Sequence, residues 1–364
     1  MIANVFWEDG RFRQSELVYE ERVLRLTPLS EGPGEGPDYV VPGLVDIHTH
    51  GGVGCDASDG DPAGLDAMSR YYAKRGVTGF LATTMTLPEE RLTRAVETAG
   101  RFRAGRDGAR CLGVNMEGPF LSGAKKGAQN GADIVRPDMD LFRRLYAASG
   151  ERIRLVDVAP ETEGCLPFIR EVGRLCRVSL AHTEADYETA LAGLDAGADH
   201  VTHLFNAMPP FAHRVPGVVG AAMDRGAYAE LIADGIHIHP SAVRGAFRLF
   251  GPERVCLISD SIRCAGLGDG SYELGGQRVN VLNGRATLPD GTIAGSSIHL
   301  MDALKNVLNW GIPLETALRA ATVNPANSIG RRDAGRLTEG AEANFLIMDQ
   351  NMELKDVYLL GRAL

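Results

Sequence analysis

A repeated alternation of short apolar runs with amphipathic segments is the feature that most restricts how this chain can fold. The runs carry the β-branched and apolar residues of buried strands, and the segments between them show helical spacing, as in Leu65, Met68 and Tyr72. This order predicts βαβ units and a parallel sheet. Strands are predicted at 42–50, 77–84, 111–116, 153–158, 178–181, 200–204, 230–233 and 255–259, and helices at 64–75, 88–102, 137–148, 165–175, 185–196 and 241–250.

The number of predicted strands indicates how the sheet is arranged. Eight parallel strands that alternate with helices are typical of a closed (β/α)8 TIM-type barrel, and this is the α/β fold that we expect. A doubly wound open sheet is the alternative. The chain has 364 residues, which is enough for such a barrel and a small additional domain.

The two ends of the chain differ from the middle because apolar and polar residues alternate there without a helical period. Alternation of this kind is typical of antiparallel strands. We therefore predict a small β-sandwich domain formed by both termini, from residues 1–42 together with 334–364. The barrel is predicted to occupy residues 43–333.

A segment after the last predicted barrel strand carries turn signals rather than helical spacing. The pairs Asn283-Gly284 and Asp290-Gly291 lie among short strand-like runs, and pairs of this type favour tight turns between antiparallel strands. We predict a β-hairpin insertion near 271–294. It follows the eighth strand, where it is placed to cover a site at the end of the barrel.

The charge balance and the cysteines restrict the class of partner. The formal net charge is −9, which argues against a nucleic-acid-binding surface. The six cysteines are scattered without a Cys-x-x-Cys pair, as expected for reduced thiols. No apolar run approaches the length of a membrane span, and the N-terminus lacks a secretion-signal pattern. We expect a cytoplasmic protein without nucleic-acid or membrane partners.

A His-x-His pair ends the first predicted strand. Successive side chains of a strand point to opposite faces, so His48 and His50 lie on the same face. Two imidazoles on one face are suitable ligands for a single metal ion. An isolated pair of this kind is more often structural or exposed, so the other strand ends must decide between the two interpretations.

Side chains that bind metals also follow most of the other predicted strands. The carboxyl ends of the strands of such a barrel meet at one rim, where the chemistry takes place. Packing alone does not explain so many metal-competent residues in register there, and we predict a metal site. The residues are His48, His50, Glu117, His182, His203, His237 and Asp260. The weaker candidates are His200, for which a structural or exposed position is expected, and His213, His239 and His299.

Several longer motifs resemble one family of hydrolases. The most specific are Asn-Met-Glu-Gly-Pro-Phe at 115–120 and Val-Thr-His-Leu-Phe-Asn-Ala-Met-Pro at 201–209. With them, essentially the whole chain is similar to the amidohydrolase superfamily, and within it to the N-acetylglucosamine-6-phosphate deacetylase family. The other matching stretches lie at 42–52, 181–184, 233–237, 258–260, 295–297 and 321–326.

The resemblance implies a set of metal ligands. Family members that lack the His-x-His pair bind one metal, so one or two divalent ions are expected here. Zinc or iron is expected, with cobalt and manganese as alternatives, because the ligands are imidazoles and carboxylates. Many related enzymes bridge two metals with a lysine on the fourth strand, but no lysine lies near 153–158. The implied ligands are Glu117, His182 and His203 for one ion, and His48, His50, Glu117 and Asp260 for a second.

The resemblance also implies a reaction, in which a metal-activated water hydrolyses the acetamide of N-acetyl-D-glucosamine 6-phosphate in amino-sugar catabolism. Asp260 resembles the general base, which takes a proton from the water and gives it to the leaving amine. Gln129 stands where the family often has a histidine that holds the carbonyl oxygen, and its amide can donate a hydrogen bond but carries no charge. The residues implied for the phosphate are Asn206, Ala207, Arg214 and His237.

Three alternatives to this activity stay open. One is deacetylation of N-acetylgalactosamine 6-phosphate, and another is a cyclic amidase of the dihydroorotase or hydantoinase type, which the missing lysine disfavours. A catalytically silent relative that acts as a binding protein would be expected to have lost ligands. The expected partners are a small amino-sugar phosphate and a second copy of the chain in a homodimer. The sequence leaves open whether Arg214 serves its own site or that of the partner.

Overall fold

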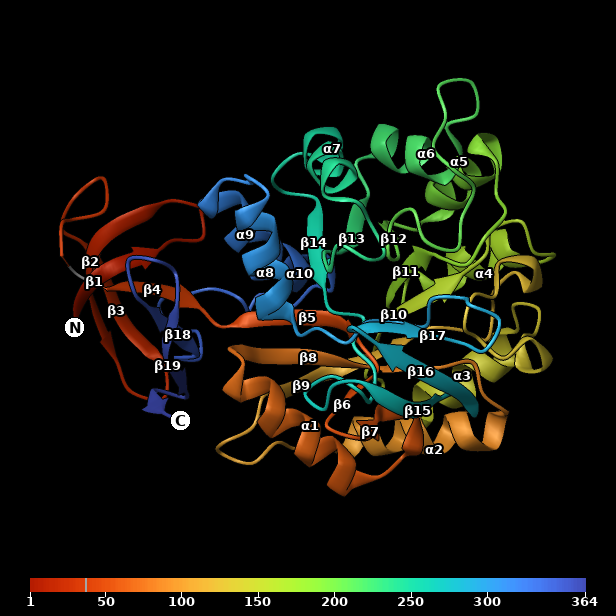
Figure 1. Ribbon diagram of the computed structural model, residues 1–364, viewed down its shortest axis with the longest axis horizontal. Helices are drawn as coiled ribbons and strands as arrows, with labels where there is room; N and C mark the ends of the chain where they lie inside the picture. Colours follow the sequence, from red (N-terminus) through yellow and green to blue (C-terminus); the bar gives the residue numbers. More distant parts are fainter. Residues whose placement is uncertain (37) are drawn as a thin grey trace.

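The fold consists of a barrel and a separate sheet that lie side by side (Figure 1). The computed structural model describes residues 1–36 and 38–364. Pro37, which falls inside the predicted small domain, lies outside the described residues. In Figure 1 the barrel is the larger unit, and the sheet at its left carries both ends of the chain.

Eight parallel strands form the barrel, in the order β14-β13-β12-β11-β10-β9-β8-β5. The first and last strands meet at their carboxyl ends, where the Asp260 N–H donates to the His48 carbonyl at 2.9 Å. The predicted (β/α)8 barrel is therefore confirmed, and the doubly wound alternative is wrong because the edge strands join each other. The strands are β5 (Leu44–Thr49), β8 (Val77–Thr84), β9 (Arg110–Met116), β10 (Ile153–Val158), β11 (Arg177–Leu180), β12 (His200–Val201), β13 (Tyr228–Ile232) and β14 (Val255–Ile258).

Helices surround the barrel (Figure 1). Those of the described chain are α1 (Pro62–Lys74), α2 (Glu89–Arg101), α3 (Met139–Ala148), α4 (Cys165–Val172), α5 (Tyr187–Ala196), α6 (Gly217–Arg225), α7 (Pro240–Phe250), α8 (Leu300–Asn309), α9 (Leu314–Ala321) and α10 (Val323–Ser328). The sequence did not predict α6, α8, α9 or α10. Helix α6 contains Gly217 and Gly220, which lower helix propensity, but its first two turns are buried against the barrel.

The sixth strand is shorter than predicted. The apolar run predicts a strand over 200–204, but β12 ends at Val201. The backbone then turns, with positive φ at His203, Phe205 and Ala207. Non-glycine residues rarely adopt positive φ, so nothing in their side-chain types signals this turn.

Strands from both chain ends share one seven-stranded sheet, in the order β20-β19-β18-β4-β1-β2-β3. Its own buried core includes Val5, Leu17 and Val40 from the first segment and Ala343 and Phe345 from the last. The bounds that we predicted for a terminal domain remain a proposal. The strands are β1 (Ile2–Phe6), β2 (Phe12–Tyr19), β3 (Val23–Pro28), β4 (Tyr39–Pro42), β18 (Phe345–Met348), β19 (Leu354–Leu359) and β20 (Arg362–Ala363).

An antiparallel insertion follows β14. It contains β15 (Gly270–Leu274), β16 (Gln277–Leu282) and β17 (Arg285–Thr287), so the predicted hairpin has a third strand. Asn283 and Gly284 connect β16 to β17 with φ of 52° and 74°, as a two-residue turn with positive φ requires. A second short hairpin, β6 (Gly51–Gly52) with β7 (Cys55–Asp56), follows β5 directly.

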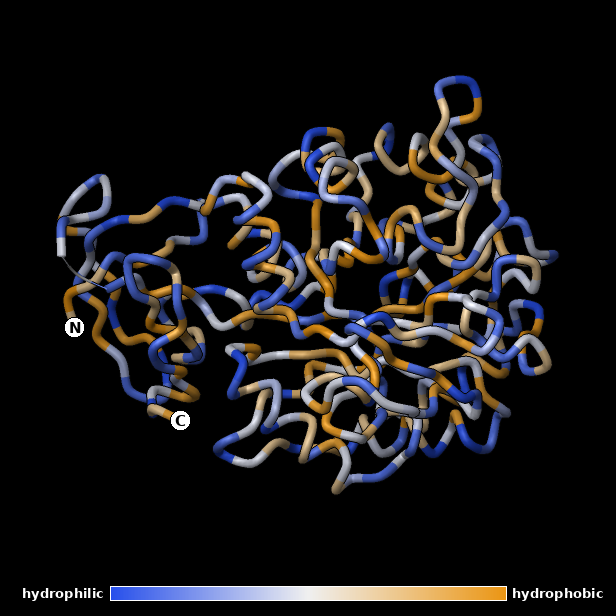
Figure 2. The backbone as a smooth tube through the Cα atoms, viewed as in Figure 1, coloured by the Kyte–Doolittle hydropathy of each residue, from blue (hydrophilic) through white to orange (hydrophobic). Residues whose placement is uncertain are grey.

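The apolar residues are concentrated inside the molecule, and the hydrophilic ones lie at the outer loops (Figure 2). One buried cluster joins successive barrel strands through Val45, Leu81, Leu112, Leu155 and Ile258. These side chains hold the strands together and so keep the strand ends at one rim. Among the described helices, none is both long and apolar enough to cross a membrane.

Candidate active site

The metal-competent residues meet at the carboxyl rim of the barrel, and all of them except the half-buried His237 are buried. Within the described chain, two groups of three side chains have ligand atoms close enough to hold one ion each. Glu117 belongs to both groups. The first group is His48, His50 and Glu117, and the second is Glu117, His182 and His203.

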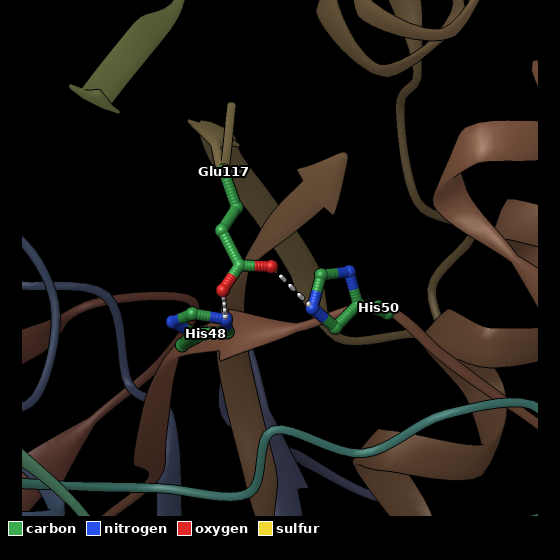
Figure 3. A group of neighbouring side chains, drawn as sticks. All are labelled: His48, His50 and Glu117. Carbon is green, nitrogen blue, oxygen red and sulfur yellow. Dashed lines mark ion pairs between the residues drawn. The ribbon is translucent and has the colours of Figure 1, made fainter. Parts of the chain in front are cut away.

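The first group combines the end of β5 with the residue after β9. His50 Nε2 lies 3.1 Å from Glu117 Oε2, and His48 Nε2 lies 3.6 Å from Glu117 Oε1. Figure 3 shows both imidazoles directed at the carboxylate from below. Asp260 lies beside this group, with Oδ1 at 3.4 Å from His50 Nε2 and 3.7 Å from His48 Nε2.

The second group combines the residues that follow β9, β11 and β12. Glu117 Oε1 lies 3.1 Å from His182 Nε2 and 3.0 Å from His203 Nε2. The two Nε2 atoms are 3.1 Å apart. One carboxylate therefore contacts four imidazoles, two through each group.

The backbone at three of these positions is strained. His182, His203 and Asp260 have φ of 43°, 31° and 48°. A non-glycine residue with positive φ costs on the order of 1–3 kcal/mol, and such residues cluster at functional sites. At each position this conformation breaks the alternation of the preceding strand, and the side chain then points toward the rim of the barrel.

The charges of the cluster shift one another's ionisation. Burial alone would lower the pKa of His50, but its interactions with Asp260 and Glu117 outweigh burial and raise the pKa to about 10. Burial alone would raise the pKa of Glu117, but the positive charge of His48 and the bonds from the other histidines hold that pKa well below its usual range. Two buried carboxylates thus create a strong preference for positive charge at this point.

The donor set fits a divalent cation. His48 Nε2 is buried and lacks a hydrogen-bond partner among the described residues, although two carboxylates face it. Imidazole nitrogens and carboxylate oxygens are the ligands that zinc, iron and similar metals prefer. The cluster is therefore compatible with a divalent metal ion.

A cavity of about 360 Å³ opens in front of both groups. Gln129, Asn206, Ala207 and His237 line it together with His50, Glu117, His182, His203 and Asp260. Side chains of the insertion and the segment that follows it, including Leu274 and Ile293, complete the wall. The volume is in the range of small-molecule sites.

The comparison with known proteins assigns the chain to a family. Residues 39–364 match the amidohydrolase family model. An N-acetylglucosamine-6-phosphate deacetylase from Lysinibacillus sphaericus is 35% identical over 364 residues, which cover 99% of this chain and 92% of that protein. This chain belongs to the amidohydrolase family. A Bacillus subtilis (strain 168) protein of the same name is 39% identical, and the match covers 86% of this chain and 82% of that protein.

Solved amidohydrolase structures agree with this assignment. An N-acetyl-D-glucosamine-6-phosphate deacetylase from Mycobacterium smegmatis, an aspartate-to-alanine variant in complex with N-acetyl-D-glucosamine-6-phosphate, superposes with a TM-score of 0.91 at 32% identity. The match covers 100% of this chain and 98% of that one. The barrel, the terminal sheet and the insertion therefore all lie within the aligned region.

The sequence analysis missed one carboxylate that supports the site of this amidohydrolase. Glu230 on β13 is fully buried, and its Oε2 lies 3.0 Å from His48 Nδ1. It also accepts a bond from the His203 N–H at 3.4 Å. The only sign of its role in the sequence is that Glu230 is a lone acidic residue inside the apolar strand Tyr228–Ile232.

Hydrogen bonds to the second ring nitrogen orient some ligands but not others. His182 Nδ1 lies 2.8 Å from the Lys125 carbonyl, as His48 Nδ1 lies beside Glu230. A fixed partner at Nδ1 sets the tautomer and directs Nε2 toward the metal. In contrast, Nδ1 of His50 and of His203 is buried without a partner among the described residues.

Gln129 lines the cavity, but its amide is engaged with Glu117. Its Nε2 donates to Glu117 Oε2 at 2.6 Å, and its Oε1 accepts the Thr86 N–H at 2.7 Å. The side chain therefore positions Glu117. A role at the substrate carbonyl stays a prediction.

The residues implied for the phosphate are not all brought together. His237 and Ala207 line the cavity, and Asp234 Oδ2 lies 2.7 Å from His237 Nδ1. Asn206 also lines the cavity, but its side-chain amide donates to the carbonyls of His203 and Leu204 in its own turn. Arg214 is exposed and is absent from the lining of this cavity.

The weaker histidine candidates lie outside the cluster. His200 is buried, with Nδ1 at 2.7 Å from Asp199 Oδ1. His239 and His299 cap the amino ends of α7 and α8, and His213 is exposed. None of the four lines the cavity at the rim.

Proposed function

We propose that this amidohydrolase removes the acetyl group of N-acetyl-D-glucosamine 6-phosphate and releases D-glucosamine 6-phosphate and acetate. The observation that carries the proposal is the position of Glu117, which joins both histidine groups and faces the same cavity as Asp260 and His237. Relatives named for this activity, at 35% and 39% identity, support the choice of substrate.

The proposal includes one or two divalent metal ions, with zinc or iron preferred and cobalt or manganese as alternatives. Glu117, His182 and His203 would hold one ion. His48, His50, Glu117 and Asp260 would hold the other. The chemistry that a bound ion supplies is polarisation of the acetyl carbonyl and activation of water.

Asp260 is suited to carry the proton. Burial alone would raise the pKa of Asp260, but its interaction with His50 and the charge of His48 keep the pKa below its ordinary value. The carboxylate is therefore ionised at neutral pH and can accept a proton from the attacking water. It then gives this proton to the sugar nitrogen, because an amine leaves poorly unless it is protonated.

The cavity wall opposite the ligands would bind the sugar phosphate. The contact with Asp234 orients the His237 ring and leaves Nε2 free for a ligand. The turn after β12, held by the Asn206 side chain, presents the backbone at Ala207 to the cavity. Leu274 and Ile293 exclude water from the far side.

The proposal extends to a homodimer in which Arg214 reaches the partner's site. Arg214 lies on the loop between β12 and α6, which projects from the barrel in green at the top of Figure 1. The loop also exposes Phe211 and Val215, at 42% and 58% of their surface. Exposed apolar side chains beside a phosphate-competent arginine suit an interface.

Mixing two inactive variants tests this shared site. Arg214→Ala subunits and Asp260→Asn subunits are each expected to be poorly active alone. If the site is shared, a refolded mixture regains activity because some sites then combine an intact Asp260 with an intact partner arginine. A mixture that stays as inactive as its parents, or a monomeric mass in solution, contradicts the shared site.

A cytoplasmic location also stays a prediction. All six cysteines are free thiols, and most of them are buried. Free thiols suit a reducing compartment. Fractionation of cells that express the protein, followed by immunodetection, tests the location.

An assay on defined substrates tests the activity. Protein loaded with zinc or iron(II) is incubated with N-acetylglucosamine 6-phosphate, and acetate and free amine are both measured. The galactosamine epimer, dihydroorotate and unphosphorylated N-acetylglucosamine are run in parallel. Higher kcat/KM on the epimer would correct the substrate, hydrolysis of dihydroorotate would indicate a cyclic amidase, and inactivity on all four would contradict the proposal.

A further inference from the structure

A second cavity, of about 520 Å³, lies at the opposite end of the barrel. It is lined by residues near the amino ends of β8, β9 and β10 and by Leu359 and Leu360 at the end of β19. It therefore lies between the barrel and the terminal sheet, and the proposed deacetylase chemistry does not use it. Six arginines line it: Arg103, Arg106, Arg110, Arg152, Arg154 and Arg331.

The positive charge of this arginine cavity is only partly neutralised. Glu342 is the single carboxylate in the lining. It accepts a bond from Arg110 at 2.8 Å, and Asp333 pairs with both Arg110 and Arg331, at 3.0 and 2.7 Å. The arginines without a carboxylate partner in the described chain are Arg103, Arg106, Arg152 and Arg154. This surplus stands out in a chain whose net charge is −9.

Two of these arginines, Arg152 and Arg154, are partly buried without a carboxylate in the described chain to neutralise them. Arg152 donates to the carbonyls of Gly100 and Cys111 at 2.7 and 2.6 Å. Burial, together with the charges of neighbouring arginines, lowers the pKa of Arg152. Arg154 Nε is buried and has no hydrogen-bond partner among the described residues. A buried donor without a partner costs about 1–3 kcal/mol, so a ligand that supplies an acceptor would be stabilised here.

We propose that the arginine cavity binds a small organic phosphate. Guanidinium groups match phosphate oxygens with paired hydrogen bonds, and a dianion would relieve the repulsion among the unpaired arginines. The volume accommodates a metabolite-sized molecule. Phe102, Leu359 and Leu360 provide apolar contacts for the body of such a molecule. The bound ligand would join the barrel to the terminal sheet.

Titration calorimetry on the full-length, metal-loaded protein tests this site with three probes. Inorganic phosphate, fructose 1,6-bisphosphate and adenosine diphosphate share the phosphate group but differ in the body of the molecule. We expect saturable binding of at least one probe with one site per chain. The probe that binds most tightly identifies the source as a free anion, a sugar phosphate or a nucleotide.

Matched variants assign the binding to the cavity. Arg106→Gln with Arg154→Gln removes two charges from arginines that have no partners, and we expect at least about tenfold weaker binding. Arg248→Gln, an exposed arginine of α7 outside the cavity, should bind the probes as the unaltered protein does. His237→Ala should also leave this binding unchanged, because His237 lines the other cavity.

Several outcomes overturn the site. They are no saturable binding of any probe up to millimolar concentration, equal binding by the double variant, or equal weakening by Arg248→Gln. Loss of binding in His237→Ala alone would assign the probes to the cavity at the carboxyl rim. If the double variant fails to fold, Arg106→Gln alone, on an exposed side chain, is expected to weaken binding severalfold, and an unchanged affinity would again overturn the site.

Discussion

The two histidine groups that share Glu117 are built in different ways. His48 and His50 stand two residues apart at the end of a single strand, β5. His182 and His203 follow two neighbouring strands, β11 and β12, and meet only because those strands pair in parallel. Local chain geometry therefore brings together the two histidines of the first group, whereas pairing of neighbouring strands brings together those of the second.

The surroundings of the groups differ as well. Asp260 lies beside His48 and His50, and His48 is further held by the buried Glu230. In the described chain, the only partner at an Nδ1 atom of the second group is the Lys125 carbonyl. Carboxylates therefore surround the first group more closely. One group can therefore be altered by local substitutions while the other stays intact, and only Glu117 contributes a side chain to both groups.

The largest effect is expected from substitution of Glu117, because both groups share this residue. Glu117→Gln keeps the size of the side chain but removes the charge that both groups share. We expect loss of metal from both groups and a fall in kcat/KM of about 10³-fold or more, since a metal supplies several kcal/mol of transition-state stabilisation. Elemental analysis and kinetics on the same sample check this. Retention of a full metal complement would show that the groups do not depend on a shared carboxylate.

Asp260→Asn separates proton transfer from metal binding. The amide cannot accept a proton, so kcat should fall by at least about 10²-fold, the lower end for a lost general acid–base group. Substrate binding should survive, because the proposed phosphate contacts lie elsewhere in the cavity. Calorimetry with N-acetylglucosamine 6-phosphate and metal analysis are the measurements. A near-normal kcat with metal retained would exclude Asp260 as the proton carrier.

Removing the two histidines of the first group tests most directly whether the two groups bind metal independently. In His48→Gln with His50→Asn, the metal content should fall by one ion per chain, while the second group keeps its ion. Activity should fall less than in Asp260→Asn. The matched variant His182→Asn should instead remove the ion of the second group. A metal content of one per chain before and after the double substitution would contradict the two-metal proposal.

The smallest effect is expected from the carboxylate behind His48. Glu230→Gln leaves all ligands in place but weakens the hold on His48 Nδ1, and partners of this kind change metal affinity by about 10–100-fold. We expect weaker binding mainly at the first group, because the amide oxygen can still accept the His203 N–H, with near-normal kcat at saturating metal. Competition with a chelator measures both affinities. Equal weakening at both groups would mean that Glu230 supports the barrel rather than one ligand.

Much of the site could be predicted because each ligand stands at a strand end. The apolar runs that precede Glu117, His182 and Asp260 predict strands, and parallel strands bring their carboxyl ends to one rim. The His-x-His pair has a period that places both rings on one face. The partners of these residues could not be predicted in this way. Nothing near Glu230 or Gln129 in the sequence indicates which histidine or carboxylate each of them contacts.

The arginine cavity is the clearest example of a feature that the sequence does not predict. Its arginines come from positions between 103 and 331 and share no spacing. They converge because the amino ends of the barrel strands face the terminal sheet, and that arrangement depends on how the two units pack. The early end of β12 was not predicted either, since the positive φ at His203 is uncommon for any non-glycine residue.

The barrel and the turn at Asn283 could be predicted from the sequence alone, because periodicity and turn preferences act between residues close in the chain. Only the folded structure shows that Glu117 contacts both histidine groups, that Glu230 stands behind His48 and that Arg214 is absent from the lining of the cavity. The physical reason is that these relations depend on which side chains the folded strands and loops bring within a few ångströms. Residues far apart in the chain carry no local signal of such contacts.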